Sequence, residues 1–265
     1  MKALSNVKDF LIDLEGTLHI GDQSIKGAVE TIDFLRSKGY SIRFITNTTR
    51  RCRKTICERL SKLGFKISER EVFSAPIAAI RYIKKRSEEL GLEPTCYLLY
   101  TGDVHRDFEE SGLILTDEKP NFVVVGDAGE NFTHTALTKA FRLLLEGAEL
   151  IAMEKDRYWK SQAGLELGAG PFVVALEYAS GKNAVLVGKP SRDFFMSVLA
   201  DMNVKPEEAA IIGDDVNSDI GGGKAIGMKG ILVKTGKYRE EDLRKASVKP
   251  DVIIPSISSL MNLLT

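Results

Sequence analysis

The chain has 265 residues, and its 37 Lys and Arg balance its 37 Asp and Glu, so the formal net charge is +0. This balance argues against a protein built for bulk binding to nucleic acid or anionic membranes, since such proteins carry a basic excess. Hydrophobic residues make up 43% and charged residues 28%, which is usual for globular proteins and excludes global disorder.

Three cysteines are too few for a disulfide scaffold, and they indicate free thiols in a reducing compartment. The N-terminal segment lacks the apolar core of a signal peptide, and no stretch is long and apolar enough to span a bilayer. We therefore expect a cytoplasmic protein that binds neither nucleic acid nor membranes.

Strands and helices alternate in the first third of the chain. Short apolar runs predict strands, and apolar residues at helical spacing followed by glycine predict helices. The expected elements are a strand at 7–12, a helix at 28–38, a strand at 41–45 and a helix at 55–63. This order favours a parallel sheet with right-handed crossovers, and therefore an α/β fold.

The middle of the chain continues the alternation as a second α/β unit inserted into the first. Its expected elements are helices at 78–90, 135–146 and 172–179 and strands at 96–100, 122–125 and 149–152. The last third returns to the first unit, with strands at 184–187, 209–212, 230–233 and 252–254 and a helical stripe at 194–199. We expect a core of residues 1–76 and 183–265 and an inserted domain of residues 77–182.

Polar side chains gather where predicted strands end. They are Asp13 with Glu15, Thr46 with Asn47, Lys189, and Asp214 with Asp215 and Asp219. In open α/β sheets ligands bind beyond the carboxyl ends of the strands, so the fold should bring these residues together. Clustered carboxylates repel one another unless a cation joins them, and they are natural ligands of Mg²⁺. A lysine and a Thr-Asn turn beside them can bind phosphate, which indicates a phosphoryl-transfer site.

Taken singly, these residues have simpler explanations. Asp13 could be a turn residue, Thr46 and Asn47 a helix cap, and Lys189 a solvated surface residue. The acidic group near 214–219 could equally be a solvated loop or a set of helix caps. Their occurrence together at successive strand ends favours the functional interpretation.

In order along the chain, these segments resemble the four motifs of the haloacid dehalogenase superfamily. They are Asp13-Leu-Glu-Gly-Thr17, Thr46-Asn47, Gly188-Lys189-Pro190 and Gly213-Asp214-Asp215 with Asp219. The insert between the second and third motifs is similar to the type II cap of that superfamily. The resemblance covers nearly the whole chain, and it implies a Rossmann-like parallel-sheet core with an inserted α/β cap.

The resemblance also implies roles for these residues. Asp13 would be the nucleophile that forms an aspartyl-phosphate. Asp13, the backbone carbonyl of Glu15 and Asp214 would hold Mg²⁺. Thr46, Asn47 and Lys189 would bind the phosphoryl group, while Asp215 and Asp219 would orient metal-bound waters or Lys189. The cap would cover the site and select the leaving group, with Tyr158 and Trp159 as candidates for that selection.

Glu15 departs from the superfamily pattern, in which active phosphatases usually carry Asp at this position. That Asp protonates the leaving oxygen and later activates water. Glu has similar acidity but one more methylene, so its carboxyl must fold back to reach the same point. The expected role of Glu15 is general acid and base with altered efficiency.

The sequence therefore predicts a Mg²⁺-dependent phosphatase acting on a small phosphorylated molecule: a phosphate ester, a phosphoamide or pyrophosphate. The alternative is a Mg²⁺- and phosphate-binding module with little turnover that acts through protein contacts. A phospho-acceptor receiver domain is disfavoured, because its acidic pair precedes the Thr and Lys, whereas here Asp214 and Asp215 come last. A homodimer is compatible with the type II cap resemblance.

Overall fold

The computed structural model describes residues 4–160 and 164–264, which form two compact units. The first unit comprises residues 1–46, 56–73 and 189–265, and the second comprises residues 47–55 and 74–188. Both are α/β units with parallel sheets, as expected from the alternation of strands and helices. Within the described ranges, no helix combines the length and apolar character needed to cross a membrane.

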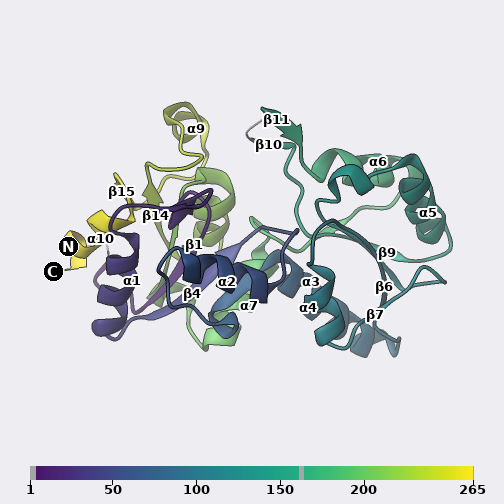
Figure 1. Ribbon diagram of the computed structural model, residues 1–265, viewed down its shortest axis with the longest axis horizontal. Coiled ribbons are helices and arrows are strands. Elements are labelled where there is room, and N and C mark those ends of the chain that lie inside the picture. Colours follow the sequence, from purple (N-terminus) through teal and green to yellow (C-terminus); the bar gives the residue numbers. More distant parts are fainter. Residues whose placement is uncertain (1–3, 161–163, 265) are drawn as a thin grey trace. The chain divides into compact units, whose positions relative to one another are not determined.

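The first unit is built on a six-stranded sheet in the order β15-β14-β13-β1-β4-β5 (Figure 1). The strands are β1 (Asp9–Asp13), β4 (Ser41–Thr46), β5 (Val72–Ser74), β13 (Ala209–Gly213), β14 (Lys229–Val233) and β15 (Val252–Ile254). The purple N-terminal strand β1 therefore lies between segments from opposite parts of the chain. It pairs in parallel with β13 on one side and β4 on the other.

Helices and one hairpin complete the first unit. They are α1 (Ala28–Ser37), α2 (Arg53–Lys62), α7 (Arg192–Met202), α8 (Gly222–Ala225), α9 (Glu240–Lys245), α10 (Leu260–Leu264) and the hairpin β2 (His19–Ile20) with β3 (Gln23–Ser24). Helix α2 begins within the second unit and continues into the first.

The core of the first unit lies on both faces of β1. All five residues of this strand are buried, as expected for a parallel strand that is covered on both sides. Phe10 and Ile12 pack in one cluster with Phe44 of β4, Ile212 of β13 and Leu35 of α1. This packing fixes the three central strands, and with them the polar residues at their carboxyl ends.

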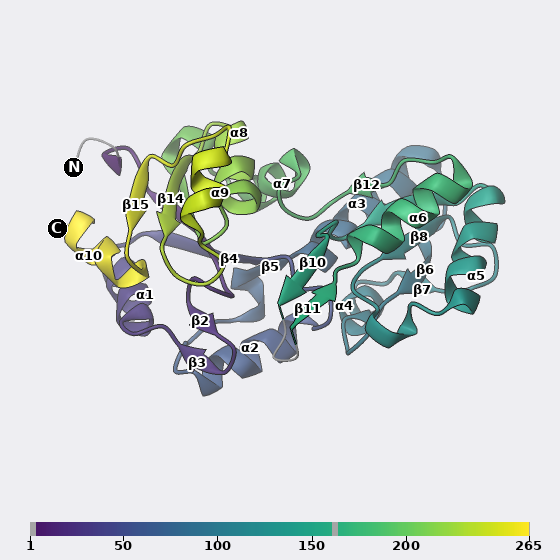
Figure 2. The same cartoon turned by 90° about the horizontal axis from the view of Figure 1, so that it is seen from above.

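The second unit has a five-stranded sheet in the order β12-β9-β8-β6-β7. Helices α5 and α6 of this unit lie side by side (Figure 2). Its strands are β6 (Thr95–Leu99), β7 (Ile114–Leu115), β8 (Phe122–Val125), β9 (Glu149–Ala152) and β12 (Val185–Leu186), with a separate hairpin of β10 (Tyr158–Lys160) and β11 (Leu165–Leu167). Its helices are α3 (Ala75–Leu90), α4 (His105–Glu110), α5 (His134–Leu145) and α6 (Gly170–Ser180).

Several elements differ from the sequence-based expectation. The helix expected at 78–90 begins earlier, at Ala75, because the Ser74 side chain caps it and Pro76 occupies its first turn. The compact units also place residues 47–55, 74–76 and 183–188 with the second unit. The sequence analysis did not predict β5, β7, α4, α9, α10 or the two hairpins, because they are too short to show a clear periodicity.

Candidate active site

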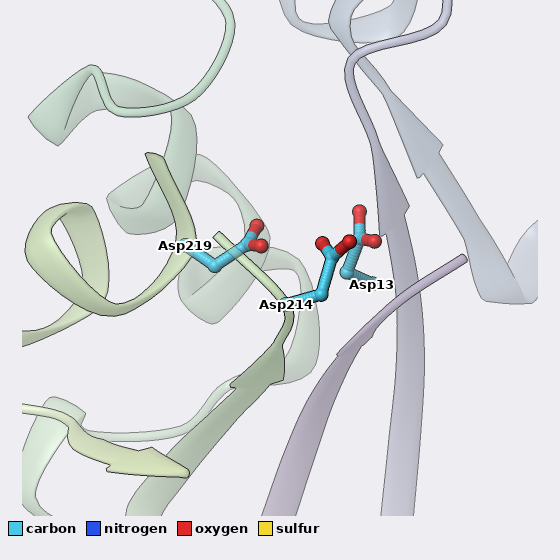
Figure 3. A group of neighbouring side chains, drawn as sticks. All are labelled: Asp13, Asp214 and Asp219. Atoms are coloured by element: carbon cyan, nitrogen blue, oxygen red, sulfur yellow. The ribbon is translucent and has the colours of Figure 1, made fainter. Parts of the chain in front are cut away.

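Asp13 and Asp214 meet at the carboxyl edge of the first sheet. Asp13 is the last residue of β1, and Asp214 directly follows the neighbouring strand β13. Because Ile12 is in register with Ile212, the two aspartates leave the sheet close to one another. Both are buried, and Figure 3 shows their carboxylates facing each other.

Asp219 and Lys189 complete this cluster from outside the strands. Asp219 lies in a π-helical turn, Val216–Gly221, that follows β13, and Lys189 precedes helix α7. The Lys189 Nζ lies 2.6 Å from Asp13 Oδ1 and 2.6 Å from Asp219 Oδ1. One oxygen from each of Asp13, Asp214 and Asp219 lies within 4.8 Å of the others, a spacing at which one cation can join all three.

Burial and mutual repulsion govern the protonation of this cluster. Burial raises the pKa of Asp214, and the negative charges of Asp13 and Asp219 raise it further. Burial also raises the pKa of Asp219, although the neighbouring Lys189 ammonium opposes that shift. Burial alone would lower the pKa of Lys189, but its two carboxylate partners hold that pKa above its ordinary value.

The donor set fits a magnesium ion. Three buried carboxylates lie together, and the Lys189 ammonium forms ion pairs with two of them, Asp13 and Asp219, so this one positive charge does not balance the cluster. Hard oxygen ligands of this kind suit Mg²⁺, which also retains part of its water shell. A bound divalent cation would lower the pKa values that burial has raised and would keep the carboxylates ionised.

A loop that the sequence analysis did not single out encloses Asp214. The amide of Lys237 donates a 2.6 Å hydrogen bond to Asp214 Oδ2, and the Thr235 hydroxyl donates a 2.5 Å bond to the carbonyl of Gly16. A Cβ at Gly16 or Gly236 would overlap the Asp214 carboxylate. Gly236, three residues after the expected strand at 230–233, was the available sequence signal, since turns at this edge of the sheet line the site.

Thr46 and Asn47 stand at the boundary of the two units. Thr46 is the last residue of β4, and the residue before it, Ile45, is in register with Asp13. The Thr46 side chain is buried in the first unit. Asn47 belongs to the second unit, where its side-chain oxygen lies so close to Gly188 that a Cβ there would approach it to 2.9 Å. Each unit thus holds one of these two consecutive residues.

The Glu15 carboxylate lies outside the aspartate cluster. Its Oε1 accepts a 2.9 Å hydrogen bond from the Gly21 amide, and its Oε2 lies 3.3 Å from His19 Nδ1. The Glu15 side chain is 54% exposed. The structure therefore places this side chain at the neighbouring hairpin turn, where it contacts Gly21 and His19.

Asp215 caps the π-helical turn. Its carboxylate accepts hydrogen bonds from the amides of Asn217 and Ser218, and its own amide donates to Asp219 Oδ2 at 3.2 Å. Asp215 therefore supports the segment that carries Asp219, and its backbone amide donates a hydrogen bond to that residue.

A second cluster lies within the second unit, three residues after Asn47. Arg50 forms two 2.9 Å hydrogen bonds to the Asp127 carboxylate, and its guanidinium stacks 4.9 Å from the ring centroid of Trp159. The neighbouring Tyr158 is 57% exposed. A pocket of about 410 Å³ lies beside this cluster and is lined by Arg50, Arg51, Thr55, Thr101, Gly102 and Asp103.

Comparisons with known proteins agree with this geometry. Two family models match, one described as haloacid dehalogenase-like hydrolase over residues 10–114 and one as HAD-hydrolase-like over residues 186–260. The chain is 47% identical to the rat haloacid dehalogenase-like hydrolase domain-containing protein 2, over 94% of this chain and 93% of that protein. It is 38% identical to the human phospholysine phosphohistidine inorganic pyrophosphate phosphatase, over 99% and 96% of the two chains.

Solved structures of phosphatases have the same fold as this chain. The 4-nitrophenylphosphatase from Thermotoga maritima superposes with a TM-score of 0.92 and 27% identity, covering 99% of both chains. The p-nitrophenyl phosphatase from Archaeoglobus fulgidus superposes with a TM-score of 0.89 and 28% identity, covering 97% of this chain and 99% of that chain.

A parallel sheet with an aspartate cluster and a buried lysine at its carboxyl edge, joined to a second α/β unit, defines a phosphatase of the type with an inserted cap. The chain belongs to the haloacid dehalogenase-like hydrolase family. The resemblance inferred from the four sequence motifs is confirmed.

Proposed function

We propose that this phosphatase is Mg²⁺-dependent and hydrolyses a small phosphorylated molecule through an aspartyl-phosphate on Asp13. The observation that carries the proposal is the position of Asp13. Its carboxylate ends a buried strand, contacts the Lys189 ammonium at 2.6 Å and shares a cation-sized space with Asp214 and Asp219. A carboxylate in this setting can approach a phosphoryl dianion only because positive charge surrounds it.

Asp13, Asp214 and the backbone carbonyl of Glu15 would hold the metal. When bound, Mg²⁺ would supply Lewis-acid stabilisation of the phosphoryl oxygens and offset the repulsion between the phosphate and the carboxylates. Asp219 accepts a 2.6 Å hydrogen bond from the Lys189 ammonium, and we assign it the role of orienting that lysine.

The chain's own residues would carry the phosphoryl transfer. One oxygen of Asp13 attacks phosphorus in line with the leaving group and forms the aspartyl-phosphate. Lys189 compensates the charge that develops on the phosphoryl oxygens. Thr46 and Asn47 would hold two of those oxygens, and water would then hydrolyse the aspartyl-phosphate. Tyr158 and Trp159 of strand β10 would influence which leaving groups the enzyme accepts.

The names of the relatives support the class of substrate. The human relative is named for phospholysine, phosphohistidine and inorganic pyrophosphate, and the Thermotoga structure for 4-nitrophenyl phosphate. These compounds share a terminal phosphoryl group on nitrogen or oxygen. We therefore propose the same set for this chain: phosphate esters, phosphoamides and pyrophosphate.

Hydrolysis of 4-nitrophenyl phosphate with added Mg²⁺ tests the proposal. We expect steady turnover that EDTA abolishes and that Asp13→Asn reduces to background, because an amide cannot act as the nucleophile. Asp33→Asn, on the exposed face of α1, is the matched control and should retain the wild-type rate. Turnover that persists in Asp13→Asn would refute the aspartyl-phosphate. An unchanged melting temperature of that variant would show that it had folded.

A further inference from the structure

We propose that Glu154 is a positioning residue. Its carboxyl group holds both ends of the β10–β11 hairpin, keeps Trp159 against Arg50, and makes substrate preference sensitive to pH. The inference rests on the proposed function, because that function gives Trp159 its part in substrate preference. All the residues involved belong to the second unit.

The β10–β11 hairpin has little packing of its own. Each strand has three residues, and together they form a two-stranded sheet separate from the five-stranded sheet of the second unit. The side chains of Tyr158, Leu165 and Leu167 are exposed. A hairpin of this size is at best marginally stable by itself. Its position therefore depends on the segments at its base and on the stacking of Trp159 with Arg50.

Glu154 joins the two segments at the base of the hairpin, residues 155–157 before β10 and residues 168–170 after β11. Its Oε2 accepts a 2.5 Å hydrogen bond from the Asp156 amide, and its Oε1 accepts a 2.8 Å bond from the Ala169 amide. Glu154 is buried, and Ala169 packs in the core of the second unit. One carboxyl group thus ties both ends of the hairpin to that core.

The backbones of these two segments touch. The Gly170 amide donates a 3.0 Å hydrogen bond to the Asp156 carbonyl. A Cβ at Gly168 would lie 2.4 Å from the same carbonyl oxygen, and a Cβ at Gly170 would lie 2.6 Å from it. Glycine at both positions permits this approach. Without the contacts to Glu154, few bonds would remain to hold the base of the hairpin together.

A negative charge on Glu154 is unfavourable in this place. Burial raises the pKa of Glu154 to about 7, and the carboxylates of Asp156 and Asp127 act in the same direction, while the two amide bonds oppose them. If the hairpin were released, water would reach the Glu154 carboxyl group and its pKa would return to the ordinary 4.5. Protonation therefore favours the held hairpin, and ionisation favours its release.

The neighbouring cations are paired with other carboxylates. Arg50 donates two 2.9 Å hydrogen bonds to Asp127, and the Lys155 ammonium lies 2.7 Å from Glu177 Oε2. Both positive charges are thus matched by carboxylates other than Glu154. Between pH 4.5 and 7 the held form binds more protons than the released form, so a rise in pH shifts the equilibrium towards release by up to about 300-fold.

Trp159 is the only tryptophan of the chain, so its fluorescence reports on this hairpin alone. The test measures acrylamide quenching of the full chain between pH 5 and pH 8. We expect the quenching constant to rise up to pH 7, as Trp159 leaves Arg50, and to stay level above it. A constant value over the whole range would overturn the proposal.

Glu154→Gln removes the titration and one of the two acceptors. We expect this variant to show stronger quenching than the wild type at pH 5 and no step between pH 5 and pH 7. Glu146→Gln, at the exposed C-terminal end of α5, is the matched control and should keep the wild-type step. A step that persists in Glu154→Gln would overturn the proposal, because another group would then control the hairpin.

Gly168→Ala is a second variant that leaves the Glu154 carboxyl group in place. Its Cβ would crowd the Asp156 carbonyl and push the two segments at the base apart. We expect stronger quenching of Trp159 than in the wild type at pH 5. Unchanged quenching would show that the base of the hairpin does not position Trp159, and it would overturn the proposal.

The functional readout is the ratio of kcat/KM for 4-nitrophenyl phosphate to that for pyrophosphate. Wild type and Glu154→Gln are compared at the same pH, so that ionisation of the substrates cancels. At pH 5 we expect Glu154→Gln to shift this ratio in the same direction as Trp159→Ala, by up to about tenfold. Equal ratios in the two proteins would overturn the proposal.

Failure of this inference is distinguishable from failure of the proposed function. The fluorescence of Trp159 does not depend on turnover, so the quenching measurements test the role of Glu154 even in an inactive protein. An absence of 4-nitrophenyl phosphate hydrolysis, or its persistence in Asp13→Asn, would remove the proposed function itself. Normal hydrolysis with a pH-independent quenching constant would remove only the inference.

Discussion

Lys189 and Asp13 are separated by 176 positions in the sequence, yet the lysine Nζ lies 2.6 Å from Asp13 Oδ1. Both side chains are buried, with Lys189 4% exposed. The same ammonium contacts Asp219 at 2.6 Å, so one cation joins two segments that follow different strands. This contact makes the stability of the site depend on charge balance.

Loss of the Lys189 charge should therefore destabilise the fold. Removing one member of a buried ion pair leaves an uncompensated charge and typically costs about 3–5 kcal/mol. We expect Lys189→Met to lower the free energy of unfolding by that order in EDTA, measured by urea denaturation.

The double variant Lys189→Met with Asp219→Asn should recover part of this loss, because it also removes one of the stranded carboxylates. Lys229→Met breaks the half-exposed pair with Asp251 and should cost less than about 1 kcal/mol. Equal losses for the two single lysine variants would contradict the role of burial.

The loop over Asp214 predicts an effect on metal binding. A Cβ at Gly236 would overlap the Asp214 carboxylate and displace it from the Lys237 amide. We expect Gly236→Ala to weaken Mg²⁺ affinity by about 10–100-fold, as is common when a group supporting a metal ligand is lost. Titration calorimetry with Mg²⁺ alone measures this.

Gly91→Ala is the control for backbone strain. Gly91 has φ of +65°, close to the +58° of Gly236, but a Cβ there would meet nothing within 4 Å. Both substitutions impose a left-handed conformation on alanine, so the contacts of the new Cβ at position 236 with Asp214 and with the Gly16 backbone distinguish them. Comparable Mg²⁺ affinities in the two variants would argue against the positioning role of the loop.

Trp159 should influence substrate preference. The Trp159 ring stacks on the guanidinium of Arg50, which donates a hydrogen bond to Asp127. Arg50 lies three residues after Asn47 in the sequence. We expect Trp159→Ala to change the relative kcat/KM values of 4-nitrophenyl phosphate and pyrophosphate by about tenfold, the scale of one stacking contact.

Inhibition by inorganic phosphate should change much less, because that ion lacks a leaving group. Tyr158→Ala should change the relative kcat/KM values of the two substrates in the same direction as Trp159→Ala. Tyr178→Ala on α6, where the ring is 91% exposed, should leave the preference unchanged. Constant relative rates in the Trp159 variant would exclude this role.

Glu154 predicts a pH-dependent stability. Burial raises the pKa of this side chain to about 7, although it accepts hydrogen bonds from the Ala169 and Asp156 amides. The folded state then binds more protons than the unfolded state between pH 4.5 and 7, so stability falls as pH rises through this window. The fall attributable to Glu154 should reach about 3 kcal/mol.

Urea denaturation of the wild type and Glu154→Gln at pH 5 and pH 8 measures this. The glutamine variant loses one of the two acceptors, which costs a similar amount at both pH values. We expect the wild type to lose more stability than the variant between the two conditions. Parallel losses would assign the pH dependence to other groups.

The sequence alone determined the order of the main elements and the family. The strands at 122–125, 149–152 and 252–254 were predicted with the bounds that the structure shows. Apolar periodicity and glycine stops depend only on residues that are near one another in the sequence, so they can be recognised without a structure. The polar residues at successive strand ends added the expectation of a shared site, because parallel strands end at the same edge.

Only the tertiary structure decided which groups contact which. Glu15 is close to the nucleophile in the sequence, and its side chain accepts a hydrogen bond from the Gly21 amide of the neighbouring hairpin turn. The loop around Gly236 and the stacking of Arg50 on Trp159 likewise join residues that are remote in the chain. Such contacts depend on packing geometry and side-chain rotamers, and neither periodicity nor motif spacing records them.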